Sequence, residues 1–106
     1  IMNWIYLIIA GIFEIGWPLG FKLAHGSNFK ITWIALSVIS MALSGYFLYV
    51  AQKTIPIGTA YIIWTSIGAI GTFIIGVAMF SDPLTFMRSF AILLILSGII
   101  ILKIAN

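Results

Sequence analysis

Apolar residues run along the chain in four long stretches separated by short polar connections. The stretches cover residues 4–21, 31–51, 57–80 and 84–102. A helix rises ~1.5 Å per residue, so about 20 residues are enough to cross the ~30 Å hydrocarbon layer of a bilayer. The connections are only a few residues long and contain Gly26, Pro56 and Pro83, which favour turns. The pattern predicts an all-α integral membrane protein with four transmembrane helices, in which residues 1–106 form a single four-span domain.

The fourth stretch contains a charged residue, Arg88, four residues after its start at Leu84. A guanidinium this close to a helix end reaches the headgroup layer, because its long stem extends along the apolar surface. We therefore count this stretch as a membrane span.

Composition agrees with a bilayer environment. Hydrophobic residues make up 63% of the chain and charged residues only 7%, too few to keep a globule of this size in water. The five Lys and Arg give a net charge of +3, but they lie singly at the ends of the stretches, which excludes a nucleic-acid-binding patch. There is no cysteine and His25 is the one histidine, so the sequence assigns no metal site and no cofactor.

The basic residues are divided almost evenly between the two membrane faces. Lys53 and Lys103 lie on one side of the four predicted spans, and Lys22, Lys30 and Arg88 lie on the other. The positive-inside rule therefore favours neither orientation. A chain of this kind fits insertion in both directions, and an antiparallel homodimer would have the inverted symmetry that recurs in transporters.

Glu14 lies in the middle of the first apolar stretch. A carboxylate at the centre of a bilayer costs roughly 2.5–3.5 kcal/mol on insertion scales, so such residues mark ion, proton or substrate paths. The alternative is that Glu14 pairs with a basic residue of a neighbouring helix to hold an assembly together. No basic residue of this chain lies at that depth, which favours the functional interpretation.

Three further polar or aromatic residues lie at a similar depth. Counted by helix rise, Glu14 is ~15 Å from its membrane face, Ser44 ~10 Å, Tyr61 ~6 Å and Trp64 ~10 Å. Taken alone, Tyr61 and Trp64 are typical packing residues, and a serine such as Ser44 commonly bonds to a carbonyl of its own helix. Their shared layer instead predicts a pocket around the carboxylate.

Residues one turn from Glu14 extend this predicted pocket. Gly11 and Trp17 are three residues away on the first helix, and residues three apart share a helix face. Aromatic faces together with an anion suit a cation, since cation–π attraction adds ~0.5–2 kcal/mol. The composition of the layer therefore predicts a cation-binding site.

Proline and glycine mark positions where the helices can bend or approach closely. Pro18 cannot donate to the carbonyl of residue 14, which predicts a kink beside Glu14. Gly68 and Gly71 give the third helix the same freedom. In the fourth helix, Ala91, Ser97 and Gly98 form a stripe of small residues suited to a dimer contact.

Together these motifs resemble the small multidrug resistance transporters over the whole chain. The matching segments are IAGIFEIGW, KTIPIGTAYIIWTSIGAIG and DPLTFMRSFAILLILSGIIILK, and they include the P-x-G-x-A-Y-x-x-W string from Pro56 to Trp64. The AGIFE run, Trp17 and the TSIGA run resemble the branch of guanidinium exporters rather than the branch that exports bulky polyaromatic cations.

The resemblance implies a proton-coupled antiporter that works as an antiparallel, dual-topology homodimer in the bacterial inner membrane. By the same resemblance, Glu14 would bind protons and a small organic cation alternately. The pocket around it would be lined by Gly11, Trp17, Ser44, Tyr61 and Trp64. Pro18, Gly20 and Gly45 depart from the family pattern, and a looser site would also admit substituted guanidines or small quaternary ammonium ions.

Other classes of protein fit the sequence less well. A proteolipid-like subunit of a proton-translocating complex also carries one buried carboxylate. Such a subunit usually has two spans rather than four, and it has no small-molecule site that would require aromatic residues at that depth. An accessory subunit would use Glu14 only for assembly. An enzyme is the least consistent class, because no second acid, base or nucleophile lies at the depth of Glu14.

Overall fold

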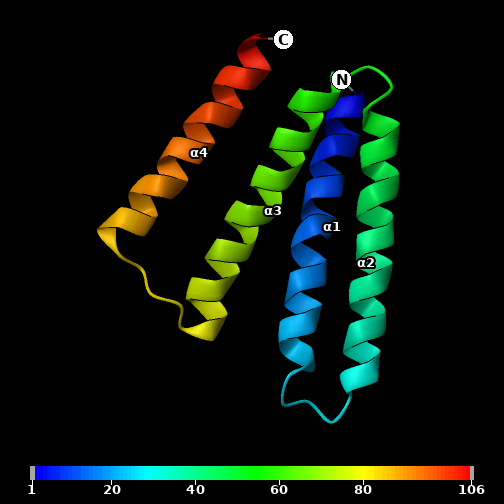
Figure 1. Ribbon diagram of the computed structural model, residues 1–106, viewed down its shortest axis with the longest axis vertical. Coiled ribbons are helices and arrows are strands. Elements are labelled where there is room, and N and C mark those ends of the chain that lie inside the picture. Colours follow the sequence, from blue (N-terminus) through cyan, green and yellow to red (C-terminus); the bar gives the residue numbers. More distant parts are fainter. Residues whose placement is uncertain (1, 106) are drawn as a thin grey trace.

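The structure, a computed structural model, describes residues 2–105 as four helices joined by short loops (Figure 1). The helices are α1 (Met2–Ala24), α2 (Lys30–Ala51), α3 (Ile57–Phe80) and α4 (Phe86–Ala105). Each has 20 to 24 residues and is long and apolar enough to cross a membrane. No strand occurs in residues 2–105, and the prediction of an all-α chain with four membrane-spanning helices is confirmed.

The four helices form a flat arrangement. Helix α1 packs between α2 and α3, and α4 lies on the far side of α3 (Figure 1). The Cα atoms extend over 46 × 35 × 17 Å, and the shortest of these dimensions corresponds to little more than one layer of helices. No described residue of α4 is buried. A single chain therefore leaves large apolar surfaces for lipid or another protein chain to cover.

A small buried core closes one end of the layer. It consists of Leu7 from α1, Ala51 and Ile55 at the α2–α3 connection, and Ala60 and Ile63 from α3. Lipid tails are as apolar as these side chains, so in a bilayer the core stabilises the helix contacts by close van der Waals packing. This core holds α1, α2 and α3 together at one end.

The start of α4 differs from the predicted start at Leu84. The helix begins at Phe86, because Thr85 occupies the capping position. The Thr85 Oγ1 atom accepts the backbone N–H of Arg88 at 3.2 Å, and the Thr85 carbonyl accepts that of Ser89 at 3.0 Å. A capping residue has non-helical backbone angles, so residues 84 and 85 belong to the loop.

Four other helix ends extend beyond the predicted apolar ranges. Helix α1 covers 2–24 rather than 4–21, α2 begins at Lys30 rather than Ile31, and α4 ends at Ala105 rather than at residue 102. Helical backbone hydrogen bonds continue through Asn3, Lys22 and Lys103, because a polar side chain does not end a helix. The α1 helix ends before Gly26, whose φ of +76° turns the chain.

Candidate functional site

Glu14 lies on α1 against the backbone of α3. It is partly buried, and its side chain passes directly over Gly68. A Cβ atom added at Gly68 would lie 2.5 Å from Glu14 Cγ, closer than real contacts of this kind. Glycine at position 68 therefore makes the space in which the Glu14 side chain lies.

Two neutral groups reach the Glu14 carboxylate. The Trp17 indole N–H donates to Glu14 Oε1 at 2.7 Å, and the Ser44 hydroxyl lies 3.4 Å from the same oxygen. These are the hydrogen-bond partners of the carboxylate within residues 2–105. Because neither partner carries a charge and both approach Oε1, the negative charge and the second oxygen remain available to a ligand.

Ser44 connects the three helices around this carboxylate. It is fully buried, and its hydroxyl lies 2.8 Å from the Ala10 carbonyl of α1 and accepts the Trp64 indole N–H of α3 at 2.7 Å. A hydroxyl has one proton to donate, so Ala10 O and Glu14 Oε1 compete for it. The shorter distance assigns that proton mainly to Ala10 O.

The aromatic side of the site comes from α3. Trp64 is partly buried, and its ring lies 5.6 Å from the Tyr61 ring at an interplanar angle of 52°. Tyr61 itself is 56% exposed. Trp64 thus belongs to the hydrogen-bonded centre of the site, whereas Tyr61 extends its aromatic wall outward.

Two surface pockets flank Glu14 and Trp17. The first, of about 280 Å³, is also lined by Met41, Gly45 and Trp64. The second, of about 320 Å³, continues along the α1–α3 interface and is also lined by Pro18, Thr65, Gly68, Ala69 and Thr72. Both pockets are open to the surface of the single chain, which gives a ligand direct access to the carboxylate.

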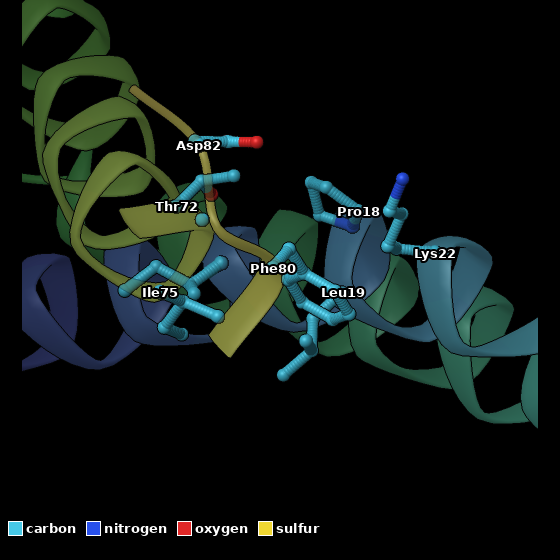
Figure 2. Close-up of a pocket in the computed structure, with 9 residues that line it drawn as sticks. Pro18, Leu19, Lys22, Thr72, Ile75, Phe80 and Asp82 are labelled. Carbon is cyan, nitrogen blue, oxygen red and sulfur yellow. The ribbon is translucent and has the colours of Figure 1, made fainter. Parts of the chain in front are cut away.

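A third pocket of about 260 Å³ continues the same groove toward the α3–α4 loop (Figure 2). It shares Pro18 and Thr72 with the pocket beside Glu14. Lys22 and Asp82 line its walls, and the Lys22 amine lies 5.7 Å from the centre of the Phe80 ring. The α1–α3 groove therefore leads from the partly buried carboxylate to a charged end of the molecule.

The other predicted positions have distinct places in the structure. Gly11 is buried beneath Ile67 of α3, and Gly71 packs under Ile15 of α1, so both allow the two helices to approach closely. Pro18 lines the groove, and α1 continues through it as one helix. The predicted kinks at Pro18, Gly68 and Gly71 remain predictions. Ala91, Ser97 and Gly98 are exposed on α4 and remain predictions as dimer contacts.

Sequence reasoning missed several residues around the site. They are Met41, Thr65, Ala69 and Thr72, which line the pockets, and Ser40, which bonds to α1. The signal was present in the spacing, because Tyr61, Thr65, Gly68 and Thr72 repeat at intervals of four and three on one face of α3. Within residues 2–105, no group of three or more metal-ligating side chains lies close enough to hold a metal ion.

Comparison with known proteins assigns the chain to a family. The sequence model of the Small Multidrug Resistance protein family matches residues 2–95. The guanidinium exporter of Yersinia pseudotuberculosis serotype I (strain IP32953) is 42% identical over 105 residues, which cover 99% of this chain and 100% of the relative. The guanidinium exporter of Escherichia coli (strain K12) is 40% identical over 105 residues, covering 99% of each chain. The chain therefore belongs to the small multidrug resistance family, which consists of membrane transporters rather than enzymes.

Proposed function

We propose that this protein exports small cations, specifically as a proton-coupled antiporter for guanidinium and small substituted guanidinium or quaternary ammonium ions. The observation that carries the proposal is a carboxylate, Glu14, whose hydrogen-bond partners Trp17 and Ser44 are neutral. The names of the similar proteins from Yersinia and Escherichia support guanidinium as the cargo. The direct test is proton-driven uptake of labelled guanidinium by vesicles that contain the purified protein.

The proposed mechanism is competition for one carboxylate. When Glu14 is ionised, its Oε2 atom and its charge bind the cation, while Trp17 holds Oε1 in place. When Glu14 is protonated, the charge that binds the cation disappears and the cargo is released. Because a cation and a proton exclude each other at Glu14, the inward proton gradient drives export of the cation.

The site favours a planar cation with N–H groups. A guanidinium donates a fork of hydrogen bonds that matches a carboxylate, and its flat face stacks on aromatic rings. Glu14 supplies the carboxylate, and Trp17 and Trp64 line the same pocket. The pocket is open on one side, so it also has room for alkyl substituents on the cation.

The proposed working unit is an antiparallel homodimer in the bacterial inner membrane. Helix α4 has no buried residue within the described chain, and the pockets beside Glu14 lack a wall on one side. A second copy packed against these faces, with Ala91, Ser97 and Gly98 at the α4 contact, would close the site. Inverted copies would also make the outward-open and inward-open forms equivalent.

Opposite orientations of the chain predict labelling from both sides of a vesicle. The chain has no cysteine, so an Asn28→Cys variant carries one reactive thiol in the exposed α1–α2 loop. A membrane-impermeant thiol reagent should label about half of the protein in intact vesicles and the remainder only after the vesicles are opened. Complete labelling, or none, in intact vesicles would contradict dual topology.

The Ser44 hydroxyl predicts discrimination between two kinds of cation. Ser44→Ala is expected to weaken guanidinium binding more than tetramethylammonium binding, by about 1 kcal/mol, because only guanidinium forms directed hydrogen bonds to the Glu14 carboxylate, whose Oε1 lies beside the Ser44 hydroxyl. Isothermal titration of both cations on one preparation measures the difference. An equal loss for both cations would mean that Ser44 acts only by holding Ala10 and Trp64 in place.

A further inference from the structure

Three serines on one face of α2 donate hydrogen bonds to backbone carbonyls of α1. The pairs are Ser37 to Trp17 O at 2.9 Å, Ser40 to Phe13 O at 2.7 Å, and Ser44 to Ala10 O at 2.8 Å. The serines are three and four residues apart, and so are the carbonyls, so the two antiparallel helices match in register. These three bonds form a row that joins the serines of α2 to the α1 carbonyls between residues 10 and 17.

Two glycines of α1 make this row possible. Gly16 faces Ser40 and Gly20 faces Ser37, and a Cβ atom added at either glycine would overlap the serine hydroxyl oxygen. Ser97 shows the alternative behaviour of a helical serine, since its hydroxyl donates to Leu93 O of its own helix at 2.9 Å. The short distance between α1 and α2 is therefore what turns Ser37 and Ser40 toward α1.

This row of bonds lies on both sides of the turn of α1 that Pro18 weakens. Pro18 has no N–H, so the carbonyl of Glu14 loses its usual helical donor, and the proline ring crowds that carbonyl. Pro18 lines the α1–α3 groove (Figure 2), while Ser37 and Ser40 hold the same turn from α2. The turn that carries the carboxylate is thus supported by side chains of the neighbouring helix.

Each serine bond fixes a specific peptide plane. A peptide unit is planar, so the Phe13 carbonyl and the Glu14 N–H are parts of one rigid group. The bond from Ser40 to Phe13 O therefore fixes the plane that leads directly into Glu14. In the same way, the bond from Ser37 to Trp17 O fixes the plane between Trp17 and Pro18.

We propose that Ser40, supported by Ser37, is a positioning residue for the cation site. It holds the α1 backbone so that the Trp17 indole meets Glu14 Oε1 across the turn that Pro18 weakens. Binding sites depend on such alignment, because errors of about 1 Å in a functional group weaken binding and catalysis strongly. This inference rests on the proposed role of Glu14 in binding the cation.

The test compares two substitutions of the same shape at position 40. Ser40→Thr keeps a hydroxyl and Ser40→Val replaces it with a methyl group, so the two variants differ only in the bond to Phe13 O. Ser40→Val is expected to bind guanidinium roughly five- to tenfold more weakly than Ser40→Thr, by the usual effect of losing one partly buried hydrogen bond. Ser27→Ala, which removes a serine bond to the Phe29 backbone N–H in the α1–α2 loop, should bind guanidinium like the unaltered protein.

A second readout separates positioning from general loss of stability. In protein labelled with ¹⁵N-tryptophan, the indole N–H resonance of Trp17 reports its bond to Glu14, and a Trp17→Phe variant assigns it. The resonance should move in Ser40→Val and keep its position in Ser40→Thr and Ser27→Ala, whatever their melting temperatures.

Two results would overturn the inference. One is equal guanidinium affinity in Ser40→Thr and Ser40→Val, and the other is an unmoved Trp17 resonance in Ser40→Val. Neither result would affect the proposed function, which fails if the unaltered protein shows no proton-driven guanidinium uptake or if uptake remains proton-coupled without the Glu14 carboxylate. Measuring Glu14→Gln beside the Ser40 pair therefore distinguishes the two failures.

Discussion

Replacing Glu14 with glutamine is expected to abolish proton-coupled guanidinium uptake while leaving the helices folded. The amide keeps the size of the carboxylate and still accepts the Trp17 indole N–H, but it neither gains nor loses a proton and carries no charge. Vesicles with an acidic lumen should take up labelled guanidinium when they contain the unaltered protein. Vesicles with Glu14→Gln should take up no more than vesicles without protein.

Asp82 provides the matched control for this experiment. It is the other acidic residue of the chain and lies in the exposed loop between α3 and α4. Asp82→Asn makes the same chemical change outside the pocket of Glu14, so it should retain proton-coupled uptake. Circular dichroism should show equal helix content in both variants. Coupled uptake by Glu14→Gln would refute the proposed mechanism.

The number and type of the helices could be predicted because they follow from the apolar pattern alone. A stretch of about 20 apolar residues has no stable alternative to a helix in a bilayer, since every backbone polar group must be paired internally. The helix ends depend on other causes. Thr85 sets the start of α4 by capping, and α1 continues past its apolar range to Ala24.

The sequence predicts where a residue lies along its helix, but it does not predict the rotation of that helix. Helix rise places Glu14, Ser44 and Trp64 in one layer, and the structure connects them by hydrogen bonds. Rotation depends on side-chain packing between helices. For this reason Gly11, predicted in the pocket, lies beneath Ile67, and Tyr61 extends outward from Trp64.

The serine contacts illustrate what a single sequence leaves open. A serine in a helix can bond to its own backbone or to a neighbour, and both choices have similar energies. Ser97 bonds within α4, whereas Ser44 bonds to Ala10 of α1. The difference arises because α4 is exposed while α2 lies against α1. The sequence alone does not show which helices are in contact.

The second large effect is expected at Gly68, where α3 passes beneath the carboxylate. A Cβ atom at this position would lie 2.5 Å from Glu14 Cγ and 3.1 Å from Glu14 Cβ. Gly71, three residues later, faces Ile15, where the nearest atom is the terminal Cδ1 of a flexible side chain. The two glycines thus have the same role in helix approach but differ in what they touch.

Gly68→Ala is therefore expected to weaken guanidinium binding far more than Gly71→Ala. Overpacking costs about 1–3 kcal/mol, and at Gly68 it displaces the stem of the binding carboxylate, which corresponds to roughly a 5- to 150-fold loss of affinity. At Gly71 the Ile15 side chain turns away, so the affinity should change by less than about threefold. Isothermal titration of guanidinium measures both variants, with helix content by circular dichroism as the check on folding. Similar losses in the two variants would mean that the separation of α1 and α3, rather than the position of Glu14, determines binding.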